Sequence, residues 1–426
     1  MLNLSDPHLI GTAPNHRKAN AAWLAILVLG VVLRIAVVAL PGNQLRAPWS
    51  GGGDAPTYVL LAQNLLGGKG FTYASQPTAL RAPGYPVVLA GLMWLFGNKY
   101  ILAVRWIQFF LGLGTVYFCS RASAAVFGEK SGRTTLVIGL FFPTLIYITG
   151  EVLTECIGAF LASLFLYLFV KQIRTPQMHV LAEMGLLIGF AALFRFNMAA
   201  LLFIGIWVAF RAKNSQPAWL RCFVLAACAA IAVSPWLIRN QIAFHGRVLY
   251  STLSGRDAVE GVLTLQGRAF PGDDEKMEAA EGWNLPDIET NDPSRMRFAS
   301  EAELNRKSWG IARGLWSHWG WRLLPLELVK CSYFWLSTDQ AFWTRSLPLG
   351  QRVFRWTGVI VYWVLLSLGI VGWFRTRQSM PVLAHAFLFY VVLLTLVHLP
   401  FPMITRLRIP FMDPLIAILA GRACWR

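Results

Sequence analysis

Long apolar runs separated by short polar breaks dominate this chain. The runs at 21–40 and 353–374 each hold about twenty mostly hydrophobic residues, enough for a helix that crosses the hydrocarbon core of a bilayer. The pattern predicts about ten transmembrane helices, at 21–41, 100–120, 134–150, 152–170, 183–196, 198–211, 220–237, 353–374, 381–399 and 404–421. The expected fold class is therefore an all-α polytopic membrane protein.

Two longer segments between the spans are expected outside the membrane. In the first, 42–99, residues 55–66 predict a helix that Asp54 caps, and the apolar stretch 85–97 predicts a helix too short to cross, lying at the interface. The second, 238–352, has a charged middle and then many tryptophans, which is typical of a small domain resting on the membrane. The expected division is a transmembrane bundle at 1–237, this extracytoplasmic domain at 238–352 and C-terminal helices at 353–426.

Charge is distributed unevenly along the chain. Hydrophobic residues make up 56% of the sequence, charged residues only 14%, and the net charge is +17. Residues 237–353 contain 14 acidic and 14 basic side chains, so the other 24 basic and 7 acidic residues account for the whole excess. A basic, acid-poor membrane region suits anionic headgroups and phosphorylated lipids rather than nucleic acid.

Lysine and arginine in the short breaks predict the orientation. If these breaks face the cytoplasm, the chain threads consistently with both termini cytoplasmic, in the cytoplasmic (inner) membrane of a bacterium. The first apolar run is too long for a cleaved signal and lacks a small-residue cleavage site, so we expect an anchor. The six cysteines show no CxxC pair and are expected to be small buried side chains.

Few acids occur in the membrane region, and three of them stand out. Asp54 follows three glycines that let a ligand approach the backbone, although its ordinary role is a helix cap. Glu151 and Glu155 are four residues apart, which predicts one helical face. The helix dipole is enough to explain an acid at position 151. Glu155 lies one turn deeper in the membrane, where a carboxylate needs a partner or water.

Arginines are expected at the same outer rim. Arg81 lies in a proline-rich loop, where a rigid backbone allows bidentate binding of a phosphate; the alternative is an arginine that reaches lipid headgroups. Further arginines lie at outer ends of predicted spans, the side where flanking cations are uncommon. They are Arg195, Arg239, Arg406 and Arg408. Their convergence predicts an anionic ligand.

Taken in order, these motifs resemble the polytopic, lipid-sugar-dependent glycosyltransferases of family 39, which have the GT-C fold and include the protein O-mannosyltransferases and the aminoarabinose transferase of lipid A. The matching motifs are Asp54-x-x-x-Tyr58, Arg81-x-Pro83-Gly84-Tyr85-Pro86, Thr154-Glu155, Gly189 to Arg195, Pro235-Trp236-x-x-Arg239-Asn240 and Arg406-x-Arg408-x-Pro410. Ala55 stands where the protein mannosyltransferases have a second acid, which argues against that branch.

The resemblance implies inverting transfer of one sugar from a polyprenyl-phosphate donor to an acceptor on a cell-envelope glycan, lipid or protein at the outer face. It implies Asp54 and Glu155 as catalytic acids. We take Asp54 as the base and Glu155 as orienting the acceptor or sharing a divalent metal ion with Asp54. The expected donor-binding residues are Tyr58, Arg81, Tyr85, Arg195, Arg239, Asn240, Arg406 and Arg408.

Two other classes of protein fit the outline of the chain. A lipid-linked-sugar transporter or flippase would be expected to have a pseudo-repeat and polar residues near the bilayer midplane, whereas the polar residues here gather at one face. An O-antigen ligase or polymerase also combines many spans with a large outer loop, but it uses diphosphate-linked sugars.

Overall fold

The computed structural model describes residues 16–39, 54–73, 75–212, 215–265, 300–339 and 348–425. The three glycines before Asp54 and most of the charged stretch at 272–307 lie outside the described residues.

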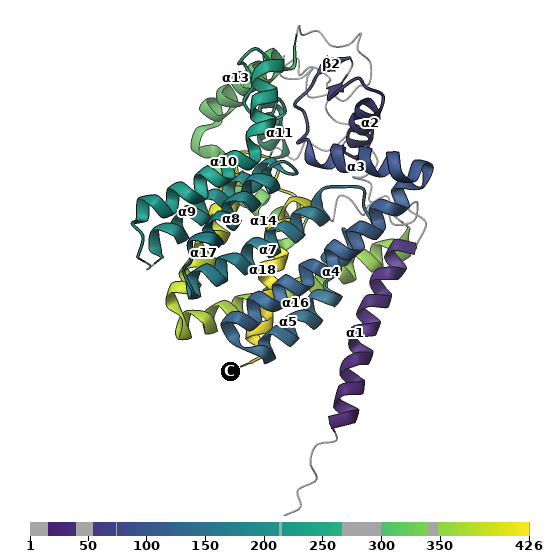
Figure 1. The fold of residues 1–426 in the computed structure, drawn as a ribbon, viewed down its shortest axis with the longest axis vertical. Helices are drawn as coiled ribbons and strands as arrows, with labels where there is room; N and C mark the ends of the chain where they lie inside the picture. Colours follow the sequence, from purple (N-terminus) through teal and green to yellow (C-terminus); the bar gives the residue numbers. More distant parts are fainter. Residues whose placement is uncertain are drawn as a thin grey trace, which may run out of the picture.

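Helices make up nearly all of the described structure (Figure 1). In the N-terminal half they are α1 (His16–Ala39), α2 (Asp54–Leu66), α3 (Gly84–Phe96), α4 (Tyr100–Phe127), α5 (Glu129–Phe141), α6 (Pro143–Tyr147), α7 (Glu155–Arg174), α8 (Met178–Ala192), α9 (Leu201–Arg211) and α10 (Ala218–Ala243). The later helices are α11 (Ser254–Leu265), α13 (Glu301–Trp319), α14 (Leu323–Leu336), α16 (Leu349–Ser379), α17 (Pro381–His398) and α18 (Thr405–Ala423). A two-residue antiparallel hairpin pairs β1 (Thr72–Tyr73) with β2 (Gln76–Pro77).

This arrangement confirms the expected all-α polytopic membrane protein. Within the described residues, six helical stretches are long and apolar enough to cross a membrane. They are 21–39, 84–127, 155–174, 218–243, 355–379 and 381–398. Each of the ten predicted spans coincides with a helix or a pair of short helices, and the remaining four are shorter or less apolar.

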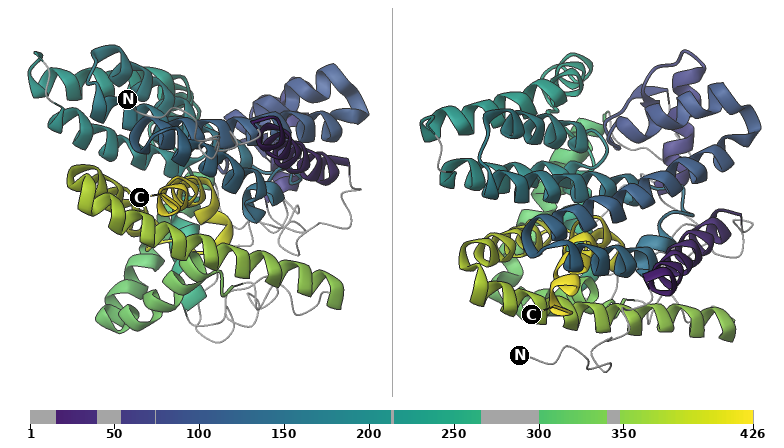
Figure 2. Two further views of the ribbon diagram at one scale, coloured as in Figure 1. Left: turned by 90° about the horizontal axis from the view of Figure 1, so that it is seen from below. Right: turned by 60° about the horizontal axis from the view of Figure 1, so that its bottom comes forward.

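The last helix, α18, forms the centre of the bundle. It packs against α16, α7, α5 and α4, and Figure 2 shows it, in yellow, between the blue helices of the N-terminal half and the green α16. Most of its side chains are buried. A buried helix does not need a continuous apolar face toward lipid, which explains how it accommodates Arg408 and Asp413.

The predicted span 134–150 is broken in the structure. Helix α5 ends at Phe141, and α6 begins at Pro143, which cannot continue the hydrogen-bond ladder of the preceding helix. The fully buried Arg34 of α1 donates to carbonyl oxygens at the end of α5, to Gly139 at 2.7 Å and to Leu140 at 3.3 Å. Irregular backbone inside a membrane bundle requires such a partner.

The prediction that Glu151 and Glu155 share a helical face is wrong. Helix α7 begins at Glu155, and residues 149–154 form turns and bends before it. The backbone carbonyls of Thr149 and Glu151 accept hydrogen bonds from the Gln108 amide of α4, at 3.1 and 2.7 Å, which holds the chain in this irregular path.

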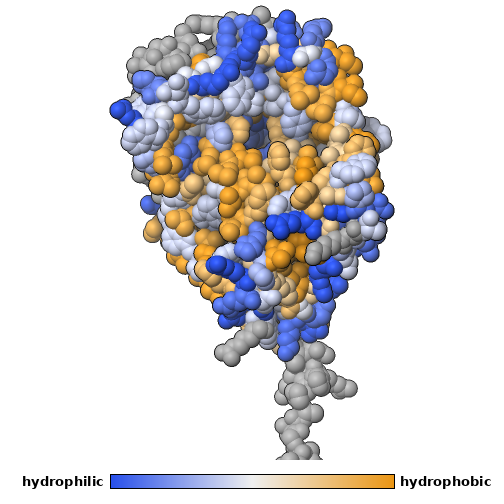
Figure 3. All heavy atoms as spheres, turned by 90° about the vertical axis from the view of Figure 1, so that its left-hand side faces the viewer, coloured by the Kyte–Doolittle hydropathy of each residue, from blue (hydrophilic) through white to orange (hydrophobic). Residues whose placement is uncertain are grey.

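The connecting elements gather at one end of the bundle. Helices α2, α3, α11 and α13 and the hairpin lie together at the top of Figure 1. On the face drawn in Figure 3, hydrophobic residues form a broad zone between hydrophilic residues at the two ends, as expected for a protein that sits in a bilayer. We refer to the end with α2 and α11 as the loop end.

Cysteine labelling tests the predicted orientation. With the native cysteines replaced, Asn98→Cys and Arg247→Cys at the loop end are expected to react with a membrane-impermeant maleimide from outside, because lysine and arginine concentrate in the opposite breaks. Glu129→Cys and Arg377→Cys are expected to react only after the membrane is opened, and all four positions are exposed. Labelling of position 377 in intact cells would show that the predicted orientation in the membrane is reversed.

Candidate functional site

Asp54 and two arginines form the first half of a charged cluster at the loop end. Asp54 is the first residue of α2, and its two oxygens bind different partners. Oδ1 lies 2.6 Å from Arg81 Nη2, in the loop before α3, and Oδ2 is hydrogen-bonded to Arg406 Nη2, at the start of α18. The three side chains are between 16% and 19% exposed. Segments 352 residues apart in the sequence therefore meet at one carboxylate.

Glu155 forms the second half of the cluster with Arg195 and the same Arg406. Its Oε1 lies 3.0 Å from Arg195 Nη1 and 3.2 Å from Arg406 Nε. Arg195 Nη1 also donates to Thr154 Oγ1 at 2.8 Å. Gly158, one turn into α7, makes room for this arrangement, since a Cβ there would lie 3.0 Å from Arg195 Cδ. Arg406 thus bridges Asp54 and Glu155.

The loop that carries Arg81 is docked onto the turn that carries Arg195. The backbone N–H of Gly84 donates to Leu193 O at 2.7 Å. A Cβ at Gly84 would lie 2.8 Å from that carbonyl oxygen, so only glycine permits this approach. This contact fixes two of the three arginines relative to each other through the backbone.

The cluster carries more positive than negative charge. Three guanidinium groups face two carboxylates, which leaves an excess of one positive charge. Burial alone would raise the pKa of Asp54, but the charges of Arg406 and Arg81 lower it well below its usual range. Asp54 is therefore ionised at neutral pH, and its negative charge holds Arg81 and Arg406 in place.

The arginines retain hydrogen-bonding capacity inside the cluster. Among the described residues, the buried Nε atoms of Arg81 and Arg195 make no hydrogen bond, whereas Arg406 Nε lies 3.2 Å from Glu155 Oε1. In addition, Asp54, Glu155 and Arg406 lie in the first turns of α2, α7 and α18, so three helix N-termini, the positive ends of their dipoles, meet at the cluster. Unused donors and converging helix N-termini favour an anionic ligand.

The two tyrosines predicted at the donor site lie beside the cluster. The Arg81 guanidinium lies over the Tyr58 ring at 5.7 Å, and the Tyr58 and Tyr85 rings meet edge to face at 5.2 Å. The hydroxyl of Tyr85 donates to Gln108 Oε1 at 3.2 Å. The tyrosines thus form an aromatic wall next to Arg81.

Arg239 and Asn240 bind backbone carbonyl groups at the loop end, and their contact with the donor stays a prediction. Arg239 donates to the carbonyl oxygens of Phe71 and Thr78, both at 2.7 Å, and its guanidinium lies 5.1 Å from the Trp236 ring. Asn240 is fully buried, with Nδ2 donating to Tyr250 O at 3.2 Å. These contacts hold the hairpin region from which the Arg81 loop continues.

Arg408 lies in the core of the bundle. It is two residues after Arg406, which puts the two side chains on nearly opposite sides of α18. Its Nε lies 3.0 Å from Asp413 Oδ1, Nη1 donates to Phe334 O at 2.9 Å, and the guanidinium lies 3.7 Å from the Tyr362 ring. These contacts favour a structural role over the predicted donor contact.

We expect Arg408→Met to destabilise the protein by ~3–5 kcal/mol, because it leaves Asp413 charged and unpaired in the core. Thermal unfolding in detergent would measure this effect. The double variant Arg408→Met/Asp413→Leu removes both charges and should recover much of the loss. An Arg408→Met protein that melts like the wild type but no longer binds a lipid-phosphate sugar would restore the predicted donor role.

The residues do not fit a metal ion shared by Asp54 and Glu155. Where the structure describes the chain, no group of three or more His, Cys, Asp or Glu side chains could hold a metal. Both carboxylates are ion-paired to Arg406, whose charge lies where a bridging cation would bind. A divalent ion would add to the positive excess, so the mechanism below is derived from the arginines.

Two residues in the surroundings of the cluster were missed by the sequence reasoning. Gln108 lies within an apolar run, and a polar side chain in a membrane helix indicates a structural or functional role. Asp257, in α11, is close enough to Arg81 and Asp54 for their charges to interact. Nothing near Asp257 in the sequence distinguishes it from the other acids of the second outer segment.

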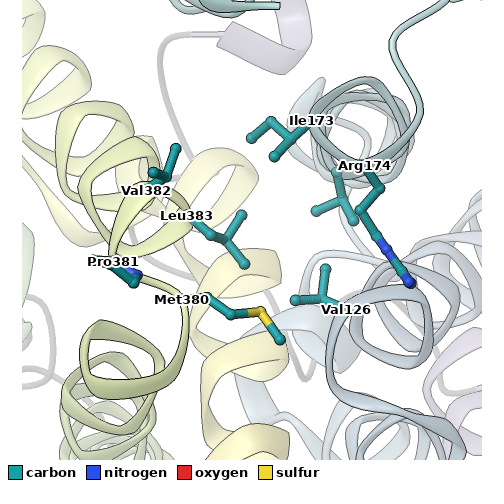
Figure 4. A pocket seen from close by; sticks show the side chains of 8 residues that line it. Val126, Ile173, Arg174, Met380, Pro381, Val382 and Leu383 are labelled. Atoms are coloured by element: carbon teal, nitrogen blue, oxygen red, sulfur yellow. The ribbon is translucent and has the colours of Figure 1, made fainter. Parts of the chain in front are cut away.

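A separate cavity of about 270 Å³ lies far from these charges, where α4 and α7 end and α17 begins. Figure 4 shows the side chains around it. It is lined by Val126, Val170, Ile173, Arg174, Met380, Pro381, Val382 and Leu383. The lining is apolar except for Arg174 and offers no group for catalysis.

No protein-family model and no curated protein sequence matches the chain. Among solved structures, it is similar to ArnT from Cupriavidus metallidurans bound to undecaprenyl phosphate, with 14% identity, a TM-score of 0.42 and coverage of 95% of this chain and 78% of that one. It is also similar to the Archaeoglobus fulgidus oligosaccharyltransferase tethered with an acceptor peptide, with 14% identity, a TM-score of 0.49 and coverage of 94% and 49%. This chain thus spans about half the length of the oligosaccharyltransferase. An activity has to be argued from the residues of this chain.

Proposed function

We propose that this protein is a membrane glycosyltransferase that moves a single sugar from a polyprenyl-phosphate donor to an acceptor at the outer face of the cytoplasmic membrane. The observation that carries the proposal is the cluster of Arg81, Arg195 and Arg406 around two acids, with an excess of positive charge and unused donors at one end of the bundle. Such a cluster suits a phosphate attached to a lipid, since the lipid tail stays in the bilayer while the headgroup reaches the arginines.

In this proposal the arginines stabilise the leaving group. As the bond between the sugar and the phosphate breaks, negative charge grows on the phosphate oxygen, and guanidinium groups held in advance stabilise it without reorganising. Asp54 and Glu155 supply that preorganisation, because each fixes two arginines. The ion pairs of Asp54 oppose the role of base given to it above, since a strongly lowered pKa makes a weak base.

The acceptor attacks from the side of the sugar opposite the phosphate, which inverts the anomeric centre. The Tyr58 and Tyr85 rings are 8% and 3% exposed, and they pack beside Arg81 as a rigid wall of the site. The acceptor hydroxyl belongs to a cell-envelope glycan, lipid or protein. In this proposal the acceptor approaches from the loop end, where Figure 1 shows α11 and α13.

The test is a transfer assay with the purified protein in liposomes and a panel of radiolabelled polyprenyl-phosphate sugars. We expect one of them to release polyprenyl phosphate in step with sugar incorporation into cell-envelope acceptors, with inverted anomeric configuration. Consumption of diphosphate-linked sugars alone would indicate a ligase or polymerase. Movement of intact lipid-linked sugar between leaflets without cleavage would indicate a flippase.

A further inference from the structure

Helix α11 is held between the segments that supply Arg81 and Arg406. At its beginning, the backbone N–H of Thr252 donates to Ala79 O at 3.1 Å, and Leu253 packs in the same apolar cluster as Leu80, the neighbour of Arg81. Near its end, Gly261 lies against the turn that leads into α18, where a Cβ would be 2.4 Å from Pro400 O. The position of α11 relative to the arginine cluster is therefore fixed at both ends.

Asp257 is the acid that this placement brings to the cluster. It lies in the first turn of α11, is half-buried, and its charge interacts with those of Arg81 and Asp54. The ordinary reason for an acid in a first helical turn is the helix dipole, which acts equally well on an exposed side chain. Asp257 lies four residues from both Leu253 and Gly261, so it shares the side of the chain that meets the Arg81 loop and the turn before α18, and the helix dipole does not require that side.

We propose that Asp257 is the general base that accepts the proton of the acceptor hydroxyl, an inference that rests on the function proposed above. The hydroxyl oxygen forms a bond to the anomeric carbon while its proton passes to the Asp257 carboxylate. At the same time the bond from that carbon to the phosphate oxygen breaks, and the phosphate leaves with the electron pair toward Arg81 and Arg406. Asp257 and the arginines thus act on opposite ends of one displacement.

The pKa values of Asp257 and Asp54 support Asp257, rather than Asp54, as the base. Burial and the nearby Glu260 raise the pKa of Asp257 to about 8, although Arg81 and Arg256 oppose the shift, whereas the pKa of Asp54 lies well below its usual range. A general base works best with a pKa near the working pH. Asp257 meets that requirement, and Asp54 does not.

The charged groups around Asp257 come from a small number of elements. Arg256 and Glu260 lie on its own helix and pair with each other at 2.7 Å, and Arg81 and Asp54 face it from across the site. Helix α13 meets the start of α11 through the uncharged Asn305 and Trp309. Helix α14 brings Lys330, which is paired with Glu327 and donates to Gly261 O one turn further along.

The test uses the full-length protein and single-turnover transfer with a saturating polyprenyl-phosphate sugar that the wild type uses. Asp257→Asn is expected to lower the rate by ~10²-fold or more, the scale of general-base catalysis, with donor affinity and melting temperature unchanged. The wild-type rate should rise with pH up to about 8 and then level off, because the base must be deprotonated. This rise should be absent in Asp257→Asn.

Glu260→Gln is the matched control, one turn along the same helix. It should keep the plateau rate but shift the rise to lower pH, because a negative charge that raises the pKa of Asp257 is removed. A rate for Asp257→Asn within a few-fold of wild type, a parallel loss of donor affinity, or a wild-type rate that is flat between pH 6 and 9 would each overturn the proposal. If the wild type transfers no sugar from any donor, the proposed function itself fails, which is a distinct outcome.

Discussion

The Arg406→Ala variant is expected to bind a polyprenyl-phosphate sugar roughly 10- to 100-fold more weakly than the wild type, because a hydrogen bond to a charged group contributes ~1.5–3 kcal/mol. Transfer should fall by a further ~10²-fold, since leaving-group stabilisation is lost in the transition state as well. Arg406 is the arginine that contacts both acids, so it affects the whole cluster. Isothermal titration with the donor in detergent and single-turnover transfer would measure the two effects.

The fold should survive this change. Asp54 keeps its ion pair with Arg81, and Glu155 keeps its ion pair with Arg195, so neither acid is left buried without a partner. Arg406→Lys should retain only part of the donor affinity and transfer of the wild type, because an ammonium group lacks the planar fork that reaches two carboxylates. The control is Arg247→Ala, an exposed arginine of the same outer segment. Donor affinity in Arg406→Ala equal to that of the control would remove the arginine cluster from the donor site.

Asp54→Asn is expected to lower transfer by ~10²-fold or more. Its melting temperature should also fall, because Arg81 loses its acidic partner in a site where the side chains are only 16% and 19% exposed. Transfer falls because the arginines are no longer held in advance in the geometry that stabilises the phosphate. Without the negative charge, Arg81 and Arg406 lose their shared partner and no longer hold one geometry for the phosphate. Asp54→Glu should also lose transfer, since it moves the carboxylate by one methylene.

The pH profile of Asp54→Asn separates the two roles that this residue can have. If Asp54 organises the arginines, the variant retains the rise in rate up to about pH 8 that we assign to Asp257, at a lower plateau. If Asp54 is the base, as the sequence predicted, the rise disappears in Asp54→Asn and persists in Asp257→Asn. Full activity in Asp54→Asn would leave Asp54 as a helix cap and nothing more.

Much of the fold could be predicted from the order of apolar runs alone. The length of a span is set by the thickness of the bilayer, so every predicted span coincides with helical structure, and the helix after Asp54 begins and ends within a residue of its prediction. The break before Pro143 was missed, although proline is the local signal for it. The gathering of Asp54, Arg81, Glu155, Arg195 and Arg406 at one end also followed from sequence, because spans of known direction place their ends on known sides.

Contacts between distant segments could not be predicted in this way. Apolar residues facing lipid resemble apolar residues facing another helix, so the sequence carries little information about which helices are neighbours. Only the tertiary structure decides that Arg406 bridges Asp54 and Glu155 while Arg408, on the other side of α18, pairs with Asp413 in the core. It also decides that Arg239 binds the backbone of the segment before Arg81 and that α11, about two hundred residues after Asp54, packs against that same segment.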